Sequence, residues 1–238
     1  MRYFRKRLDV KFKGSVINLV TKVDKAAEDA VVCTIRRSFP DHGFLGEESG
    51  ATAVDSPFRW IIDPLDGTTN FVHGFPFFCV SIGFEAYGKV VVGIVYDPTR
   101  DAMFVAQKCR GAFLNGKRIH VSKTRRMDHS MITTGFAYNV KSATDNNILN
   151  FGKVIMAARA IRRTGAAALD LCHVAAGWFD GFWELFLNPW DTAAGVLIVQ
   201  EAGGRVTNFK GRVFDLSMKG ILATNGKIHR DMVRILKK

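Results

Sequence analysis

The first part of the chain pairs one helical pattern with a short strand. Apolar positions recur three and four residues apart over residues 20–39, which predicts an amphipathic helix closed by Pro40. A β-rich run follows at residues 58–62. We expect this strand to end at Asp63-Pro64, because proline cannot continue a central strand.

Consecutive strand-like runs follow without a helix between them. They are separated by connections short enough for hairpins and lie at residues 77–84, 90–96 and 103–106. Asn115-Gly116 predicts a further hairpin with a type I′ turn. Such a series of antiparallel strands argues against a plain doubly wound parallel sheet.

Helical and strand-like runs alternate in the second half. Helices are predicted at residues 166–176, 192–202 and 227–236, an aromatic strand-like run at 179–187, and short strands within 213–224. No linker rich in Pro, Gly or Ser and no internal repeat interrupts the chain. The sequence therefore predicts a layered α/β (α+β) protein whose two sub-regions, at about 14–140 and 141–238, pack as one domain over residues 1–238.

Composition narrows the class of protein. Of 238 residues, 47% are hydrophobic and 24% are charged, which excludes disordered and fibrous chains. No apolar run reaches the roughly 20 residues of a membrane span, and the basic N-terminus lacks the apolar core of a secretory signal. The four cysteines lie far apart, which argues against a disulfide scaffold and against structural zinc. We therefore expect a cytoplasmic enzyme with reduced thiols.

The net charge of +12 lies entirely at the two ends of the chain. Residues 1–13 sum to +5, residues 205–238 sum to +7, and the segment between them is neutral. Basic termini suit either a solvated periphery or a surface that binds polyanions. A nucleic-acid or transcription-complex binding role through these termini is therefore an alternative of a different functional class.

Three acidic clusters carry the candidate chemistry, and they lie at residues 46–50, 63–70 and 189–195. In the middle cluster Asp63 ends an apolar strand, where packing gives no reason for a carboxylate. Asp66 follows three residues later, so both carboxylates can face one point with the Leu65 carbonyl between them. Taken singly, such aspartates are also typical of turns and helix caps. Glutamates in a glycine-flanked loop are, taken singly, typical solvated charges.

Taken together, the clusters resemble a known family. GEES, DPLDGTTNF and PWDTAAG, in this order, are similar to the motifs of the inositol monophosphatase family, which contains Mg²⁺-dependent, lithium-sensitive phosphatases. LVTKVD, RRTGAAALD and EAGG support the resemblance, which extends from Lys13 to the C-terminus. It implies the five-layer αβαβα sandwich of the inositol monophosphatase and fructose-1,6-bisphosphatase type, and a homodimer.

The resemblance also implies a metal site. It assigns two or three Mg²⁺ ions per subunit to Glu47, Asp63, the carbonyl of Leu65, Asp66 and Asp191. Two carboxylates about 4 Å apart repel each other by about 4 kcal/mol at an effective dielectric constant near 20, so four of them need cations to stay ionised. Oxygen ligands without His or Cys favour Mg²⁺.

The implied reaction is hydrolysis of myo-inositol monophosphate by a metal-activated water, which Glu47 and Thr68 orient. A fructose-1,6-bisphosphatase or a dual-specificity sugar phosphatase is the alternative within this class. The substrate contacts implied by the resemblance are Asp66, Gly67, Thr68, Arg162, Gly165, Ala166, Ala167, Glu184 and Asp191. Without the resemblance, Glu184 would be an exposed strand charge and Arg162 part of a surface salt bridge.

Two departures from the family pattern affect these expectations. Ala166 stands where a hydroxyl residue is usual, which removes one hydrogen-bond partner for the substrate. Only twelve residues precede Lys13, whereas family members usually begin with a long helix before the matching lysine. That first helix is therefore expected to be missing.

Overall fold

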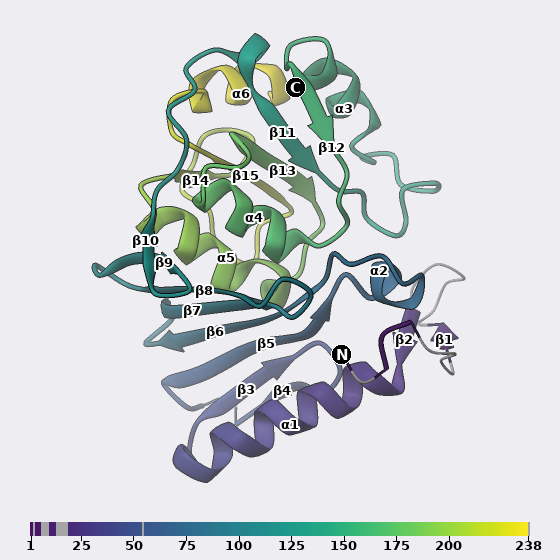
Figure 1. Ribbon diagram of the computed structural model, residues 1–238, viewed down its shortest axis with the longest axis vertical. Helices are drawn as coiled ribbons and strands as arrows, with labels where there is room; N and C mark the ends of the chain where they lie inside the picture. The colour runs from purple at the N-terminus through teal and green to yellow at the C-terminus, as the bar shows by residue number, and fades with distance from the viewer. Residues whose placement is uncertain (2, 6–9, 13–18, 54, 238) are drawn as a thin grey trace.

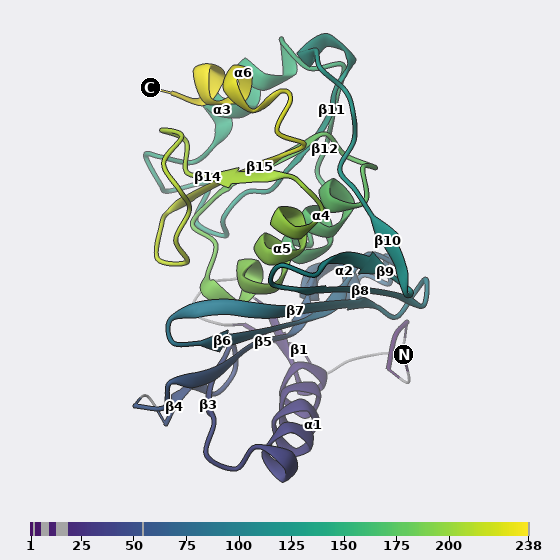
Figure 2. The same cartoon turned by 90° about the vertical axis from the view of Figure 1, so that its left-hand side faces the viewer.

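A computed structural model describes residues 1, 3–5, 10–12, 19–53 and 55–237. Lys13, where the family resemblance begins, lies outside the described residues. The chain forms two principal sheets with helices outside and between them (Figures 1 and 2). Among the described helices, none combines the length and the apolar character that crossing a membrane requires.

The larger sheet has eight strands in the order β10-β9-β8-β7-β6-β5-β3-β4. They are β3 (Gly43–Gly46), β4 (Gly50–Thr52), β5 (Phe58–Asp66), β6 (Cys79–Ala86), β7 (Lys89–Asp97), β8 (Ala102–Gln107), β9 (Gly111–Leu114) and β10 (Lys117–Ile119). All neighbouring pairs are antiparallel except β3 and β5, which run parallel. A separate pair, β1 (Val10–Phe12) and β2 (Leu19–Thr21), lies next to helices α1 and α2 (Figure 1).

The smaller sheet has five strands in the order β12-β11-β13-β15-β14. They are β11 (Met131–Thr134), β12 (Ala160–Arg162), β13 (Gly181–Leu185), β14 (Arg205–Thr207) and β15 (Gly220–Thr224). The helices are α1 (Lys22–Ser38), α2 (Thr68–Val72), α3 (Ile148–Ile155), α4 (Ala167–Ala175), α5 (Pro189–Glu201) and α6 (His229–Leu236), with a 3₁₀ turn at Met127–His129.

These elements stack in five layers (Figure 2). Helix α1 covers the outer face of the larger sheet, α4 and α5 fill the space between the sheets, and α3 and α6 cover the outer face of the smaller one. The buried core lies mainly in the middle layer, where Leu169, Leu171 and Ile198 are fully buried. The observed order is the αβαβα sandwich that the family resemblance implies.

Two glycines of the larger sheet let α5 approach its strands closely. A Cβ atom on Gly93 would lie 2.7 Å from the carbonyl oxygen of Ala194, and one on Gly83 would lie 2.9 Å from the Ala193 side chain. Because α5 carries Asp191 near its start, this contact also sets where that carboxylate lies.

Strand β5 continues past the point where the sequence predicts its end. Asp63 pairs with Ser81 and Asp66 pairs with Cys79, so one extra residue is inserted as a β-bulge between them. A bulge tolerates proline because the ladder hydrogen bonds are already interrupted there. The prediction that Pro64 ends the strand is therefore wrong, and the irregularity lies within the acidic motif.

Other expectations hold with shifted bounds. The helix predicted at residues 20–39 is α1, and Asn115-Gly116 forms the expected turn with φ values of 47° and 77°. Helix α5 begins at Pro189 and not at residue 192, because Asn188 caps it. Of the strands expected within 213–224, the structure forms β15 and a single bridge at Val213.

We expect Gly93→Ala to lower the free energy of unfolding by about 1–3 kcal/mol, since the added methyl group meets helix backbone that cannot move alone. Gly152→Ala is the matched control: it lies exposed in α3 with open space around its Cβ position, and should stabilise by about 0.5–1 kcal/mol. Urea unfolding of both variants measures the difference. Equal stabilities would contradict the close contact between α5 and the sheet.

Candidate active site

A cavity of about 190 Å³ lies where β5 ends and three helices begin. Every acidic residue that the family resemblance assigns to metal lines it, together with Leu65, Gly67 and Thr68. The starts of α4 and α5 contribute the opposite wall, through Ala166, Ala167 and Asp191. Segments more than one hundred residues apart in the sequence therefore meet at one small space.

The bulge in β5 places two buried carboxylates at the cavity floor. Asp63 accepts a hydrogen bond from the Leu65 backbone N–H at 2.9 Å. Asp66 accepts hydrogen bonds from the N–H groups of Ala167 and Ala168, at 3.2 and 2.7 Å. These two donors belong to the first turn of α4, where N–H groups have no partner within the helix. The start of α4 thus holds Asp66 in place.

Glu47 directly follows β3, and α1 holds the loop that carries it. The backbone N–H of Glu47 donates to Ile62 O at 3.2 Å. The buried carboxylate of Glu28 accepts hydrogen bonds from the N–H groups of Glu48 and Ser49, at 2.9 and 2.8 Å. A Cβ atom on Gly46 would lie 2.5 Å from that carboxylate, so only glycine fits there.

Thr68 is buried beside a second acidic residue of α1. Its hydroxyl lies 3.2 Å from Asp24 Oδ1 and 3.0 Å from the carbonyl oxygen of Leu65, and can donate its one proton to either. Asp24 and Glu28 are not among the site residues that the sequence predicts. Their spacing of four places two like charges on one helix face, which is unfavourable for a solvated helix and was the available signal.

Asp191 combines a capping role with a place in the cavity. It is the third residue of α5, and its Oδ2 accepts a hydrogen bond from the Asn188 backbone N–H at 2.6 Å, as in a capping box. The same side chain lines the cavity with Asp63 and Asp66. The cap interpretation and the functional interpretation of Asp191 are therefore compatible.

Burial and mutual repulsion raise the pKa values of these carboxylates. Burial raises the pKa of Asp63 well above its usual value, and the charges of Asp66, Glu47 and Asp191 raise it further. Burial is also the main cause that raises the pKa of Asp66 to about 7 and that of Asp191 to about 8. All four carboxylates can be ionised together at neutral pH only if positive charge enters the cavity.

The donor set fits a hard divalent cation. The groups that the family resemblance assigns to a metal are carboxylate oxygens and one carbonyl oxygen, which suit Mg²⁺. No three His, Cys, Asp or Glu side chains in the described part of the chain are already grouped as metal ligands. The indication for a cation is therefore the concentrated negative charge and the chemistry of the donors, and not a closed coordination shell.

The wall opposite the floor differs from the sequence-based expectation. Glu184 is buried, and its carboxylate lies 2.3 Å from where a Cβ atom on Gly135 would be. The interpretation of Glu184 as an exposed strand charge is therefore wrong. Arg162 is exposed, donates to Ile161 O at 3.0 Å and does not line the cavity. The arginine that does line it is Arg163, the residue directly after the end of β12.

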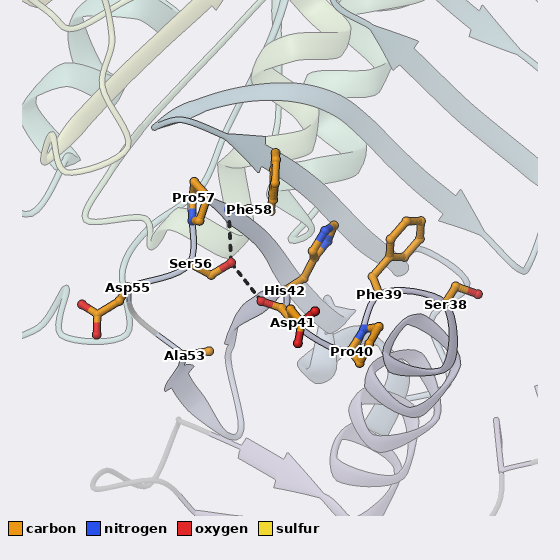
Figure 3. A pocket seen from close by; sticks show the side chains of 10 residues that line it. All are labelled: Ser38, Phe39, Pro40, Asp41, His42, Ala53, Asp55, Ser56, Pro57 and Phe58. Atoms are coloured by element: carbon orange, nitrogen blue, oxygen red, sulfur yellow. Dashed lines mark hydrogen bonds between the residues drawn. The ribbon is translucent and has the colours of Figure 1, made fainter.

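A larger hollow of about 720 Å³ lies elsewhere, beside the end of α1 (Figure 3). Its walls include the rings of Phe39, His42 and Phe58, and His42 Nδ1 accepts a hydrogen bond from Trp60 Nε1 at 3.0 Å. The His42 ring also stacks on Phe39, with 4.8 Å between ring centroids. The hollow lacks convergent carboxylates, so the smaller cavity is the candidate active site.

Comparison with known proteins decides the family. The inositol monophosphatase family matches residues 1–238. This chain belongs to that family. The chain is therefore an inositol monophosphatase-family phosphatase, and the match confirms the resemblance drawn from the three acidic motifs.

Curated relatives divide between two names. The chain is 48% identical over 225 residues to the inositol-1-monophosphatase of Synechocystis sp. (strain ATCC 27184 / PCC 6803 / Kazusa), covering 94% of this chain and 78% of that protein. It is 45% identical over 222 residues to Nus factor SuhB of Escherichia coli (strain K12), covering 93% of this chain and 83% of that protein. Overall identity therefore does not separate the two kinds of relative.

Solved structures confirm the predicted fold. The inositol monophosphatase of Anabaena (Nostoc) sp. PCC 7120 superposes with a TM-score of 0.88 at 46% identity, over 90% of this chain and 85% of that one. An inositol monophosphatase/NADP phosphatase complexed with Mg²⁺ and phosphate superposes with a TM-score of 0.85 at 27% identity, over 97% and 87%. A relative of the same fold thus binds the cation that the donor set suits.

Glu28→Gln tests whether α1 positions the Glu47 loop. Each of the two N–H groups donates to a different oxygen of Glu28, and Gln replaces one of these oxygens with an NH₂ group that cannot accept. We therefore expect turnover to fall about tenfold and the free energy of unfolding to fall by about 1–3 kcal/mol. Asp29→Asn, on the exposed side of the same helix, is the control and should change neither. Phosphatase assays and urea unfolding measure both; a Glu28→Gln protein with unchanged turnover would contradict the positioning role.

Proposed function

We propose that this chain is a Mg²⁺-dependent phosphomonoesterase that hydrolyses myo-inositol monophosphate to inositol and phosphate. The observation that carries the proposal is the convergence of buried carboxylates, with raised pKa values, on one cavity floor. The name of the Synechocystis relative supports the substrate, and the Mg²⁺ and phosphate in a related crystal structure support the cofactor.

The residues that would hold two or three Mg²⁺ ions are Glu47, Asp63, Asp66, Asp191 and the carbonyl of Leu65. Bound there, the cations would lower the pKa of water and neutralise charge on the phosphoryl group. The N–H groups of Leu65, Ala167 and Ala168 occupy the other lone pairs of Asp63 and Asp66, and so fix which way these carboxylates face.

The proton of the attacking water would pass to the protein through residues at the β3 and β5 ends. Asp24 holds the Thr68 hydroxyl, which would orient the water oxygen, and Glu47 would accept the proton. The backbone N–H groups of Gly67 and Thr68 would bind phosphate oxygens. We propose no covalent intermediate, because no Cys or His nucleophile lines the cavity among the described residues.

The alcohol part of the substrate would lie against the start of α4 and β13. Gly165, Ala166 and Ala167 line that side of the cavity, with Glu184 across from them. The buried Glu184 carboxylate can accept hydrogen bonds from the hydroxyl groups of a polyol. Ala166 offers no side-chain hydrogen bond, so we propose a broader range of sugar phosphates, including fructose 1,6-bisphosphate, than a hydroxyl residue would allow.

A homodimer is part of the proposal. One end of the smaller-sheet region exposes apolar side chains on and after α3: Ile148 is 55% exposed, Leu149 79%, Ile155 49% and Met156 87%. Apolar side chains grouped on one helix are typical of surfaces that a second subunit covers. We propose this helix as part of that subunit contact within a single phosphatase domain.

Metal dependence is the test of the proposed function. Hydrolysis of myo-inositol 1-phosphate should vanish in a chelator, return with Mg²⁺, and fall when Li⁺ is added. Glu47→Gln should lose at least about 100-fold in turnover, because it removes a ligand charge and the proton acceptor together. Glu48→Gln, whose side chain does not line the cavity, is the matched control and should stay within a few-fold. Chelator-resistant activity would overturn the proposal.

The second candidate function is binding within a transcription complex, which the Escherichia coli relative's name, Nus factor SuhB, favours. The structure exposes a series of basic side chains along β14, the β14–β15 segment and α6: Arg205, Lys210, Arg212, Lys219, Lys227, Arg230, Arg234 and Lys237. Such a surface binds nucleic acid without a sequence preference.

If this surface binds RNA, gel retention of a single-stranded RNA should fall steeply as salt rises. Substituting Gln for Arg212 and Arg230 together should reduce retention about tenfold at low salt, by removing two phosphate contacts. Gln in place of Lys89 and Lys108, which are equally exposed on the larger sheet, is the control. Absence of retention at low salt would remove this candidate and leave the phosphatase proposal intact.

A further inference from the structure

Helix α1 leaves one part of the outer face of the larger sheet uncovered. The helix ends at Ser38, and Pro40 follows it. Beyond this point β5 and β6 present aromatic side chains on the face that α1 covers elsewhere. Trp60 and Phe84 are paired in the register of the two strands, with 4.6 Å between their ring centroids, and the Phe39 ring at the helix end lies 5.8 Å from that of Trp60.

The uncovered part carries a continuous array of rings. His42 lies in the middle of the array, and its ring stacks on Phe39 at 4.8 Å and on Phe84 at 5.5 Å between centroids. At one edge Tyr87 contacts Phe58 in a T-shaped pair, with 5.4 Å between the ring centroids. Phe39 is 44% exposed and Tyr87 is 76% exposed. Exposed rings grouped in this way are typical of a binding surface, and their faces attract cations.

The hollow beside these rings is acidic. Asp41 and Asp55 line it, and none of the described residues in its walls is a lysine or an arginine. Neither carboxylate forms an ion pair or a hydrogen bond with a residue that the structure describes. The Ser56 hydroxyl is already used, since it donates to the carbonyl oxygen of Asp41 at 3.0 Å and accepts from the Phe58 N–H at 3.4 Å (Figure 3). The charge that remains is therefore complementary to a cation.

We propose that this hollow, of about 720 Å³, is a docking surface for an arginine-containing segment of another protein. A guanidinium group can lie flat on a ring face while its N–H groups reach a carboxylate, which the compact ammonium group of lysine does not match. Asp41 and Asp55 come from different loops, and their side chains point away from each other (Figure 3). An extended segment with two basic residues suits that arrangement better than one small cation.

The same features argue against other occupants. An acidic hollow repels the phosphate groups of nucleic acid, so it is a different kind of surface from the basic one along α6. Arg5, in the basic N-terminal segment of this chain, donates to the carbonyl oxygen of Gly74 at 3.4 Å, just after α2. The hollow shares no lining residue with the active-site cavity, so docking here does not depend on hydrolysis.

The probe for this surface is the peptide acetyl-Arg-Gly-Arg-amide. Two-dimensional NMR of the isotope-labelled full chain follows the indole N–H of Trp60, which donates to His42 and which Trp60→Phe assigns. The peptide should shift this signal, with a dissociation constant in the millimolar range. Asp41→Asn combined with Asp55→Asn should weaken binding about 3- to 10-fold, because two exposed ion pairs are lost. Phe39→Leu keeps apolar volume without a ring face, and should weaken it about 2- to 5-fold.

Two controls test whether positive charge at this position is what binds. A peptide with citrulline, the neutral isostere of arginine, at both positions should not bind measurably. Asp29→Asn combined with Asp101→Asn removes the same charge from exposed positions outside the hollow, and should leave the dissociation constant unchanged. Phosphatase assays of all variants check that the fold is intact.

Three results would overturn the proposal and leave the phosphatase function standing. The first is equal binding of the citrulline peptide, since the contact would then be apolar only. The second is an unchanged dissociation constant when Asp41 and Asp55 are both replaced. The third is a Trp60 signal that moves with protein concentration in the absence of peptide, which would assign the surface to a second copy of this chain.

Discussion

The crowding of negative charge at the end of β5 is the constraint on which the rest of the structure depends. Asp63 and Asp66 are buried beside Glu47 and Asp191, and both burial and repulsion oppose their ionisation. The protein lowers that cost with backbone N–H groups, from Leu65 and from the start of α4. Ionisation of all four carboxylates at once would need cations, so an acidic cavity of this kind suits a metal site.

The layers of the fold bring these carboxylates together and hold them in place. The bulge at Pro64 turns two carboxylates of one strand toward the same space, which regular alternation would not do for residues three apart. The middle layer then brings the starts of α4 and α5 to the strand end, and the glycines beneath α5 let it come close enough. On the outer face, α1 does more than cover the sheet, because Glu28 holds the loop that carries Glu47.

The sequence predicts the parts of this arrangement that local chemistry determines. Hydrophobic spacing is sufficient to predict helix α1, and the dipeptide Asn115-Gly116 is sufficient to predict the hairpin turn that it forms. Both features depend only on residues that are neighbours in the sequence. Motif order is sufficient to group the acidic residues around one cavity. The roles of Asp24 and Glu28 depend on contacts with Thr68 and with the Glu48 loop, which periodicity does not encode. Arg162 and Arg163 are adjacent arginines that the sequence does not distinguish, and only the backbone path at the end of β12 decides which one lines the cavity.

The division of relatives between inositol monophosphatase and Nus factor names has a physical counterpart in this chain. The cavity floor is made of carboxylates that backbone groups hold in place. It therefore tolerates few substitutions and contributes little to discrimination between substrates. Discrimination must then come from positions outside the floor, and charge varies with least cost to folding where those positions are exposed. Arg163 lines the cavity and is exposed, whereas the exposed arginines of α6 do not line it. Substrate choice and polyanion binding can therefore change independently while the catalytic floor stays the same.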